Sequence, residues 1–245
     1  MIRARFEKPD QIFEGCPDTV ILPLAEAIKT KGNPRFCEKT VIAEIPAIIW
    51  PDSMDAVRRQ LSAVKEAGIT DALAENLGAI ALAKEYGFVI HGGMTLNILN
   101  AEALEQYRKL GLTDITLSFE LPFAESRGLE APDTGLVTYG YLPLMKFRNC
   151  PAQGKKGCGT CGGRNELKDR KGERFPVVCR ERRYSELLNC VPLYVGDRRL
   201  PKVGFETLYF TIETRETCET VYRTYVRRET PAFRRTAGLY FRELL

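Results

Sequence analysis

The sequence has very little histidine, and this scarcity narrows the chemistry that the chain can perform. His91 is the only histidine among 245 residues, and no His-Glu-x-x-His pattern occurs. A zinc protease of that type is therefore excluded, and Ser-His or Cys-His catalysis would depend on one residue. No Gly-x-Gly-x-x-Gly or P-loop pattern follows the first expected strand, which disfavours a nucleotide-binding fold.

Long apolar stretches are also absent. No run approaches the roughly 20 apolar residues that a membrane-spanning helix needs, and residues 1–9 contain no apolar core of a signal peptide. We therefore expect a cytoplasmic protein without a membrane span. Because thiols stay reduced in that compartment, the eight cysteines are expected to remain free or to bind a metal.

Half of these cysteines lie in one glycine-rich stretch, residues 142–179. They are Cys150, Cys158, Cys161 and Cys179, in the spacing C-x7-C-x2-C-x17-C. The glycines between them allow tight turns that bring thiolates from separate turns to one point. Four thiolates suit either zinc or an iron-sulfur cluster, so the spacing alone leaves the metal open.

Positive charge is concentrated around the same cysteines. From Lys146 to Arg183 the chain has twelve basic and four acidic residues, whereas the net charge of the whole chain is only +4. Such a basic loop predicts a polyanionic partner, for example the phosphate backbone of RNA. The alternative is a solvated loop whose cations offset the charge of the thiolates.

Expected strands and helices alternate along the chain, which indicates a parallel sheet. The expected strands are residues 18–24, 40–45, 69–74, 88–91, 113–119, 136–141, 191–195 and 205–212. Eight such units in about 250 residues favour an α/β fold of the (β/α)8 TIM-like barrel type, with a doubly wound open sheet as the alternative. We expect one barrel domain over residues 1–245, with a Cys-rich, Gly-rich basic insertion at residues 142–190, after the sixth expected strand.

In such a barrel the functional site lies at the carboxyl ends of the strands, from which the insertion would also leave. Polar residues at these ends are candidate substrate contacts: Asn76, His91, Asn97, Glu120, Tyr139, Arg148, Arg170 and Glu213. Arg148 and Arg170 are the strongest candidates, because a guanidinium fork binds carboxylate or phosphate. The alternative role for each residue is a structural hydrogen bond or a surface ion pair.

Several short motifs support a family resemblance. They are LSFEL at 117–121, YGYLPLM at 139–145, RNCP at 148–151, LKDRKG at 167–172, FPV at 175–177 and YFTIE at 209–213. Together with the C-x-x-C pair they resemble the collagenase-like peptidase family U-32. The likeness extends from about Glu44 to the end of the chain and is strongest between Gly140 and Cys179.

This resemblance implies oxygen-independent hydroxylation of RNA bases or of a quinone precursor. It also implies a 4Fe-4S cluster on four cysteines, and prephenate as the hydroxyl source in the RNA-modifying members. It therefore favours a cluster over zinc on the four cysteines of the insertion. The family signature has a Glu, a Gly-Ala or Gly-Ser pair and a Cys before its second cysteine, where this chain has Gly135, Gly140-Tyr141 and Pro143. The C-x-x-C pair supplies the thiolate that is missing at Pro143.

The leading hypothesis is iron-sulfur-dependent hydroxylation, or a related modification, of RNA or another anionic substrate. RNA would bind the basic loop, and prephenate would be a small co-substrate. Candidate catalytic residues are Arg148, Arg170, His91, Glu120 and Tyr139. One alternative is a collagenase-like peptidase that uses His91 or two carboxylates from distant strand ends. Another is a non-catalytic barrel with a structural zinc site.

Overall fold

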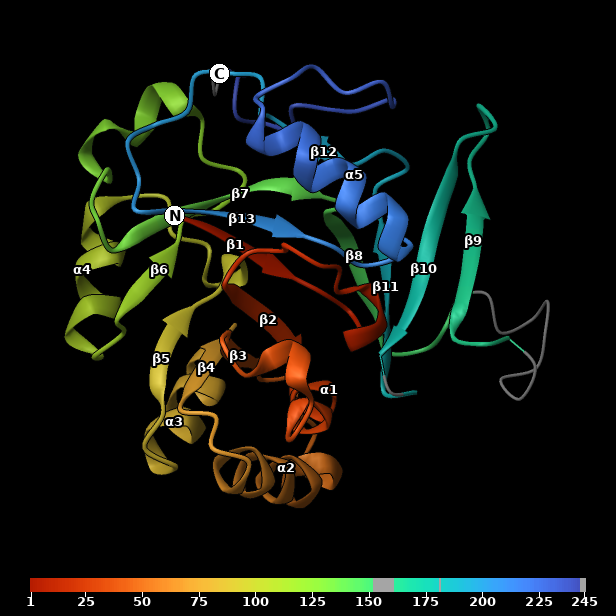
Figure 1. Ribbon diagram of the computed structural model, residues 1–245. Helices are drawn as coiled ribbons and strands as arrows, with labels where there is room; N and C mark the ends of the chain where they lie inside the picture. Colours follow the sequence, from red (N-terminus) through yellow and green to blue (C-terminus); the bar gives the residue numbers. More distant parts are fainter. Residues whose placement is uncertain (152–160, 181, 243–245) are drawn as a thin grey trace.

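A closed barrel of eight parallel strands forms the main body of the computed structural model, which describes residues 1–151, 161–180 and 182–242 (Figure 1). Around the ring the strands are β1 (Ile2–Arg5), β2 (Thr19–Pro23), β3 (Thr40–Glu44), β4 (Asp71–Ala74), β5 (Val89–Gly92), β6 (Asp114–Thr116), β7 (Thr134–Gly140) and β13 (Phe205–Tyr209). Pairing of β6 with β7 closes the ring. The expected (β/α)8 TIM-like barrel is therefore confirmed.

The strand count differs from the expectation at two places. Residues 191–195 contribute only β12 (Leu193–Tyr194), which pairs antiparallel with the outer edge of β7 and is not a barrel strand. The missing barrel strand is β1, whose apolar signal is weakened because Arg3 and Arg5 alternate with Ile2 and Ala4. The insertion consequently follows the seventh strand around the barrel, not the sixth.

Five helices cover the outside of the barrel: α1 (Leu24–Ala27), α2 (Met54–Glu66), α3 (Leu77–Glu85), α4 (Ala101–Lys109) and α5 (Arg215–Val226). Asparagine side chains begin two of them, because Asn76 and Asn100 each accept a hydrogen bond of 2.8 Å from a backbone N–H of the first turn. A 3-10 helix, Phe123–Gly128, follows β6. No helix in the described ranges is both long and apolar enough to cross a membrane.

The insertion folds as a separate antiparallel sheet. Its strands are β8 (Pro143–Phe147), β9 (Arg164–Lys168), β10 (Arg174–Arg180) and β11 (Tyr184–Leu188), in the spatial order β8-β11-β10-β9. Figure 1 shows this sheet standing beside the barrel, with β9 farthest from it. The inner strands β11 and β10 therefore lie between the barrel and the outer edge of the insertion.

Side chains that point into the barrel form a polar, an apolar and a second polar layer. Near the amino ends of the strands, Arg3 bonds to Asp114 across the barrel. Above them is a small apolar cluster of Ile21, Ile42 and Leu73. Beyond that cluster the inward side chains are charged again, beginning with Arg5 and Glu44, and they face the insertion. The carboxyl end of the barrel is thus open to a polar cavity.

Candidate active site

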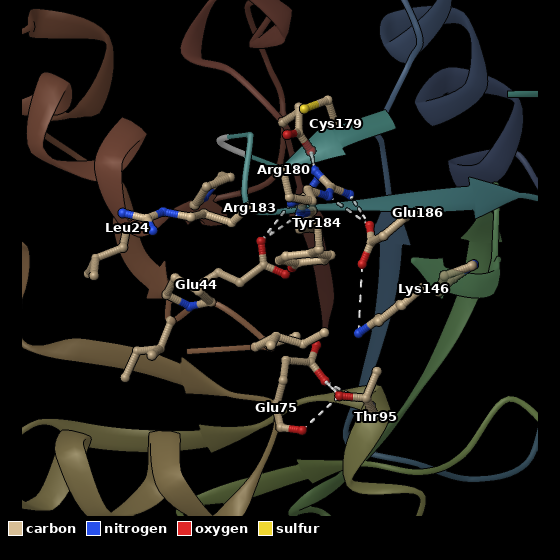
Figure 2. A pocket seen from close by; sticks show the side chains of 18 of the residues that line it. Leu24, Glu44, Glu75, Thr95, Lys146, Cys179, Arg180, Arg183, Tyr184 and Glu186 are labelled. Atoms are coloured by element: carbon tan, nitrogen blue, oxygen red, sulfur yellow. Dashed lines mark hydrogen bonds and ion pairs between the residues drawn. The ribbon is translucent and has the colours of Figure 1, made fainter. Parts of the chain in front are cut away.

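A cavity of about 120 Å³ lies between the carboxyl ends of β1–β4 and the insertion sheet (Figure 2). Charged and hydroxyl-bearing side chains from both parts of the molecule line it, among them Arg5, Glu44, Glu75 and Thr95 from the barrel, and Lys146, Arg180 and Glu186 from the insertion. We call this space the barrel-mouth cavity. It occupies the position at which β/α barrels place their active sites.

Arg5 is the central cation on the barrel side of the cavity. Its Nε and Nη2 donate to Glu44 Oε2 at 3.0 and 2.6 Å, and Nη1 donates to Glu7 Oε2 at 2.5 Å. Nη1 also donates to the carbonyl oxygen of Phe210 at 3.1 Å, and the guanidinium lies 4.7 Å from the ring centroid of Tyr209. With these partners the buried guanidinium is satisfied within the protein.

Arg180 of β10 connects the insertion to this network. Its Nε and Nη2 donate to Glu186 Oε2 at 2.7 and 2.6 Å, and Nη1 donates to Glu7. Glu7 therefore lies between Arg5 and Arg180. Burial raises the pKa of Glu7, but the two guanidinium groups outweigh burial and lower the pKa to about 2. The carboxylate of Glu7 thus joins barrel and insertion through buried ion pairs.

Glu75, directly after β4, is the most isolated acid of the cavity. Only 5% of its surface is exposed. Its Oε2 lies 2.7 Å from the backbone nitrogen and 2.5 Å from the hydroxyl of Thr95. Burial raises the pKa of Glu75, and the nearby carboxylate of Glu44 raises it further. Gly93 makes room for the carboxyl group, since a Cβ atom at residue 93 would lie 2.3–2.5 Å from it.

Two surface contacts hold the insertion against the loop after β3. The guanidinium of Arg148 lies 4.6 Å from the ring centroid of Trp50, and Arg183 Nη1 is 2.9 Å from Asp52 Oδ2. Arg148 is therefore an exposed residue that packs on an aromatic ring, outside the lining of the cavity. Such exposed contacts add little stability compared with the buried pairs of Glu7.

The other candidate substrate contacts lie outside the cavity lining. Arg170 is exposed in the turn after β9, and Glu120 is exposed after β6. Tyr139 is buried in β7, where its hydroxyl donates to Glu213 Oε1 at 2.8 Å. Asn97 accepts a hydrogen bond of 2.6 Å from the hydroxyl of Ser118. The structure thus assigns structural contacts to Tyr139, Asn97 and Glu213.

His91 belongs to a buried ion network inside the barrel. Its Nδ1 lies 2.9 Å from Asp114 Oδ2 and its Nε2 lies 3.0 Å from Asp71 Oδ1, while Arg3 donates to both oxygens of Asp114. Burial lowers the pKa of His91, but hydrogen bonds to the two aspartates outweigh burial and raise it. With both ring nitrogens engaged, His91 is placed as an internal cation and does not line the barrel-mouth cavity.

This network predicts a pH-dependent contribution to stability. A raised folded pKa means that the contribution of His91 is complete below its unfolded pKa of about 6.5 and is lost as the pH rises through the folded pKa. We expect His91→Gln to lower the free energy of unfolding by roughly 1.5–3 kcal/mol at pH 5.5 and by less at pH 9. Urea unfolding of both proteins at the two pH values measures this difference, and an equal loss at both would contradict it.

Two described cysteines of the insertion, Cys161 and Cys179, both contact Gly163. Cys161 Sγ accepts a hydrogen bond of 3.4 Å from the backbone N–H of Gly163, whose carbonyl oxygen accepts one of 2.9 Å from the N–H of Cys179. Cys150 follows β8 and is partly exposed, and Cys158 lies outside the described residues. Within residues 1–151, 161–180 and 182–242, no three His, Cys, Asp or Glu side chains group closely enough to hold a metal.

Most residues that line the cavity are not among the predicted site residues. Glu44 and Glu75 could have been predicted, since each stands at the carboxyl end of an expected strand, but the prediction names Asn76 and not its neighbour Glu75. Asn76 instead begins α3 and donates to the carbonyl oxygen of Ala47 at 2.8 Å. Arg5 was not detectable in this way, because it lies in a strand that the apolar pattern marks only weakly.

Comparison with known proteins relates the barrel to a family. The model of peptidase family U32 matches residues 25–138. Over this segment the chain is similar to peptidase family U32. The match includes Glu44, Glu75 and Thr95 of the barrel, and it ends before the cysteines of the insertion. No curated protein and no solved structure matches the chain.

Proposed function

We propose that this protein is an enzyme that modifies RNA or another anionic substrate by iron-sulfur-dependent hydroxylation or a related reaction in the barrel-mouth cavity. The observation that carries the proposal is the position of Cys179, which lines this cavity together with its neighbour Arg180. Figure 2 shows Cys179 at the end of the cavity away from Glu75. A group bound at the cysteines would therefore lie at the edge of the cavity.

The cysteines of the insertion suit a cluster in number and in chemistry. Four thiolates provide full ligation of a 4Fe-4S cluster, and an N–H donor such as that of Gly163 at Cys161 Sγ is a contact that tunes cluster sulfurs. Cys150, Cys158, Cys161 and Cys179 would hold the cluster. When bound, it would supply one-electron chemistry next to the cavity.

Charges around the cavity support an anionic substrate. Arg5 and Arg180 are each neutralised by two carboxylates, whereas Lys146 has one ion-pair partner within the described part of the chain, Glu186, whose Oε1 lies 3.7 Å from the ammonium and beyond hydrogen-bond distance. Lys146 is thus available for a carboxylate of a small co-substrate such as prephenate. On the outer surface, Arg148 and Arg170 are exposed and would meet the phosphate backbone of RNA.

A collagenase-like peptidase is the second candidate, and one observation favours it. Glu44 and Glu75 extend from neighbouring strands into one cavity, and Glu44 contributes to the raised pKa of Glu75. Two carboxyl groups in one cavity, one of them paired with a cation and the other not, are an arrangement that hydrolases use for acid-base catalysis. His91 does not contribute to this scheme, because it lies in its own ion network.

Anaerobic purification with single cysteine variants tests the proposal. We expect a brown protein that contains iron and sulfide, and complete loss of both in Cys161→Ser and in Cys179→Ser. The matched control is Cys37→Ser, since Cys37 is exposed and lies outside the insertion. A colourless protein with one zinc per chain would contradict the cluster and support the structural zinc site. Gelatin cleavage that Glu44→Gln abolishes would support the peptidase.

A further inference from the structure

The hydroxyl oxygen of Thr95 contacts two oxygen atoms of Glu75, and these two contacts together require two hydrogens. The hydroxyl oxygen of Thr95 lies 2.7 Å from the backbone carbonyl oxygen of Glu75 and 2.5 Å from its side-chain Oε2. A hydroxyl carries one hydrogen, and a carbonyl oxygen can only accept. If Thr95 donates to the carbonyl oxygen, a second hydrogen must lie between Thr95 Oγ1 and Glu75 Oε2, because two bare acceptors at 2.5 Å repel each other.

We propose that Glu75 is held as a neutral carboxylic acid and is the proton donor to a small molecule bound in the barrel-mouth cavity. Its donor role rests on the proposed function, whereas its protonation state does not. The ligand that fits is one that presents a carbonyl or carboxylate oxygen to Glu75. A space of about 120 Å³ admits a portion of a molecule somewhat smaller than benzene.

The neighbouring carboxyl groups of Glu44 and Glu75 have different hydrogen-bond partners. Glu44 receives two hydrogen bonds from Arg5 and one of 3.2 Å from the hydroxyl of Tyr209, so it is held as a carboxylate. Glu75 has no cation at hydrogen-bond distance among the described residues, and burial raises its pKa. The other charged and titratable groups that line this cavity are Arg5, Glu7, Glu44, Lys146, Cys179, Arg180, Arg183, Tyr184, Glu186 and Tyr209.

Lys146 gives the ligand a second point of attachment. Figure 2 shows its ammonium group between Glu186, with which it forms an ion pair of 3.7 Å, and the contact of Glu75 with Thr95. A ligand with an anionic group at Lys146 and an acceptor oxygen at Glu75 would bridge the two sides of the cavity. The barrel supplies the acid and the insertion supplies the cation, so both parts of the chain would be needed for binding.

Thr95 can also stabilise the product of proton transfer. For transfer, the acid hydrogen turns from Thr95 Oγ1 to the acceptor oxygen of the ligand; the O–H bond of the acid breaks, an O–H bond forms on the ligand, and a carboxylate remains. The hydroxyl of Thr95 then rotates its hydrogen to Oε2, where the backbone N–H of Thr95 already donates at 2.7 Å, and its hydrogen bond to the carbonyl oxygen of Glu75 is given up. Thr95 is therefore a positioning residue, which stabilises both protonation states of Glu75 with the same oxygen atom.

Infrared difference spectra of the full chain test the protonation state directly. Subtracting the spectrum of Glu75→Gln from that of the wild type at pH 7 should leave the C=O band of a neutral carboxylic acid. In Thr95→Val this band should persist to higher pH, since the carboxylate loses a donor, and Thr95→Ser should restore the wild-type titration. Carboxylate bands at pH 7 in place of the acid band would overturn the proposal.

The melting temperature and kcat of Glu75→Gln show whether Glu75 acts as an acid or has only a structural role. Glu75→Gln keeps the neutral shape, so its melting temperature should come closest to that of the wild type at about pH 4, where the carboxyl group is protonated in the unfolded state as well. At pH 9 the variant should melt at a higher temperature than the wild type, because the unfolded wild type gains stability by ionising and the folded one must bury the charge. In the holoenzyme, kcat of Glu75→Gln should fall at least about 100-fold while KM stays within a few-fold. Unchanged kcat in an active holoenzyme would overturn the donor role. A holoenzyme that modifies no RNA would instead overturn the proposed function, and the infrared result would stand.

Discussion

Replacing Arg5 by methionine is expected to lower the free energy of unfolding by about 3–5 kcal/mol. The substitution keeps an apolar stem of similar length but leaves the partly buried carboxylate of Glu44 without its two charged hydrogen bonds. It also removes one of the two guanidinium groups that hold Glu7 ionised. Denaturant unfolding followed by circular dichroism measures the loss. The dependence of the free energy on denaturant concentration should stay the same, which would show that both proteins expose the same surface on unfolding.

Arg108→Met is the matched control for this substitution. Arg108 also forms a two-pronged pair, with 2.7 Å contacts to both oxygens of Asp133, but about a third of each side chain is exposed. Solvent and salt screen such a pair, so its loss should cost less than about 1 kcal/mol. Equal effects of the two substitutions would mean that the buried network contributes no more than a surface ion pair.

Arg5 and Arg180 should also be coupled, because both bind Glu7. When one guanidinium is removed, Glu7 keeps the other partner; when both are removed, a buried carboxylate is left without either. The loss in Arg5→Met/Arg180→Met should therefore exceed the sum of the single losses by about 1–2 kcal/mol. Strict additivity would show that the insertion and the barrel are stabilised independently.

The arrangement of this network explains how far the sequence could predict the site. Alternating strands and helices are a local signal, and they predicted the barrel with seven of its eight strands. The pair of Glu7 and Arg180 joins residues 173 positions apart in the sequence. They become neighbours only when the barrel closes and the insertion packs against it. Local spacing carries no information about such pairs.

The cysteine pattern illustrates the same limit at shorter range. Its spacing predicted convergence of four thiolates, and the described residues show Cys161 and Cys179 on either side of Gly163. The antiparallel strands β9 and β10 cause this proximity, and sequence analysis expected only a loop there. Because β10 carries both Cys179 and Arg180, the same strand serves the proposed cluster and the ion network of the cavity.

The residues that line the cavity come from inside and from outside the segment that matches family U32. Glu44, Glu75 and Thr95 lie within the matched residues 25–138, whereas Lys146, Arg180 and Glu186 lie beyond them. A cavity that draws on both parts gives the insertion a role in ligand binding besides that of its cysteines. The matched segment alone would present the acid of the cavity without the cation that faces it.

Gly204→Ala is expected to destabilise the protein by roughly 3 kcal/mol through a clash of backbone atoms. A Cβ atom at this position would lie 1.8 Å from the carbonyl oxygen of Pro132. The oxygen cannot move freely, since the N–H of Gly204 donates to the flanking carbonyl oxygens of Ala131 and Thr134 at 3.1 and 2.8 Å. These contacts fix the segment before β13, the strand that closes the barrel between β7 and β1.

Gly128→Ala is the control that shows the general effect of adding a methyl group without a clash. No atom lies within 4 Å of a Cβ built on exposed Gly128, so Gly128→Ala should change stability by no more than about 0.5 kcal/mol. Thermal unfolding of both variants distinguishes the two cases, and a Gly204→Ala protein as stable as Gly128→Ala would contradict the close approach. Because β13 carries Tyr209, which bonds to Glu44, displacement of this strand should also weaken ligand binding in the barrel-mouth cavity.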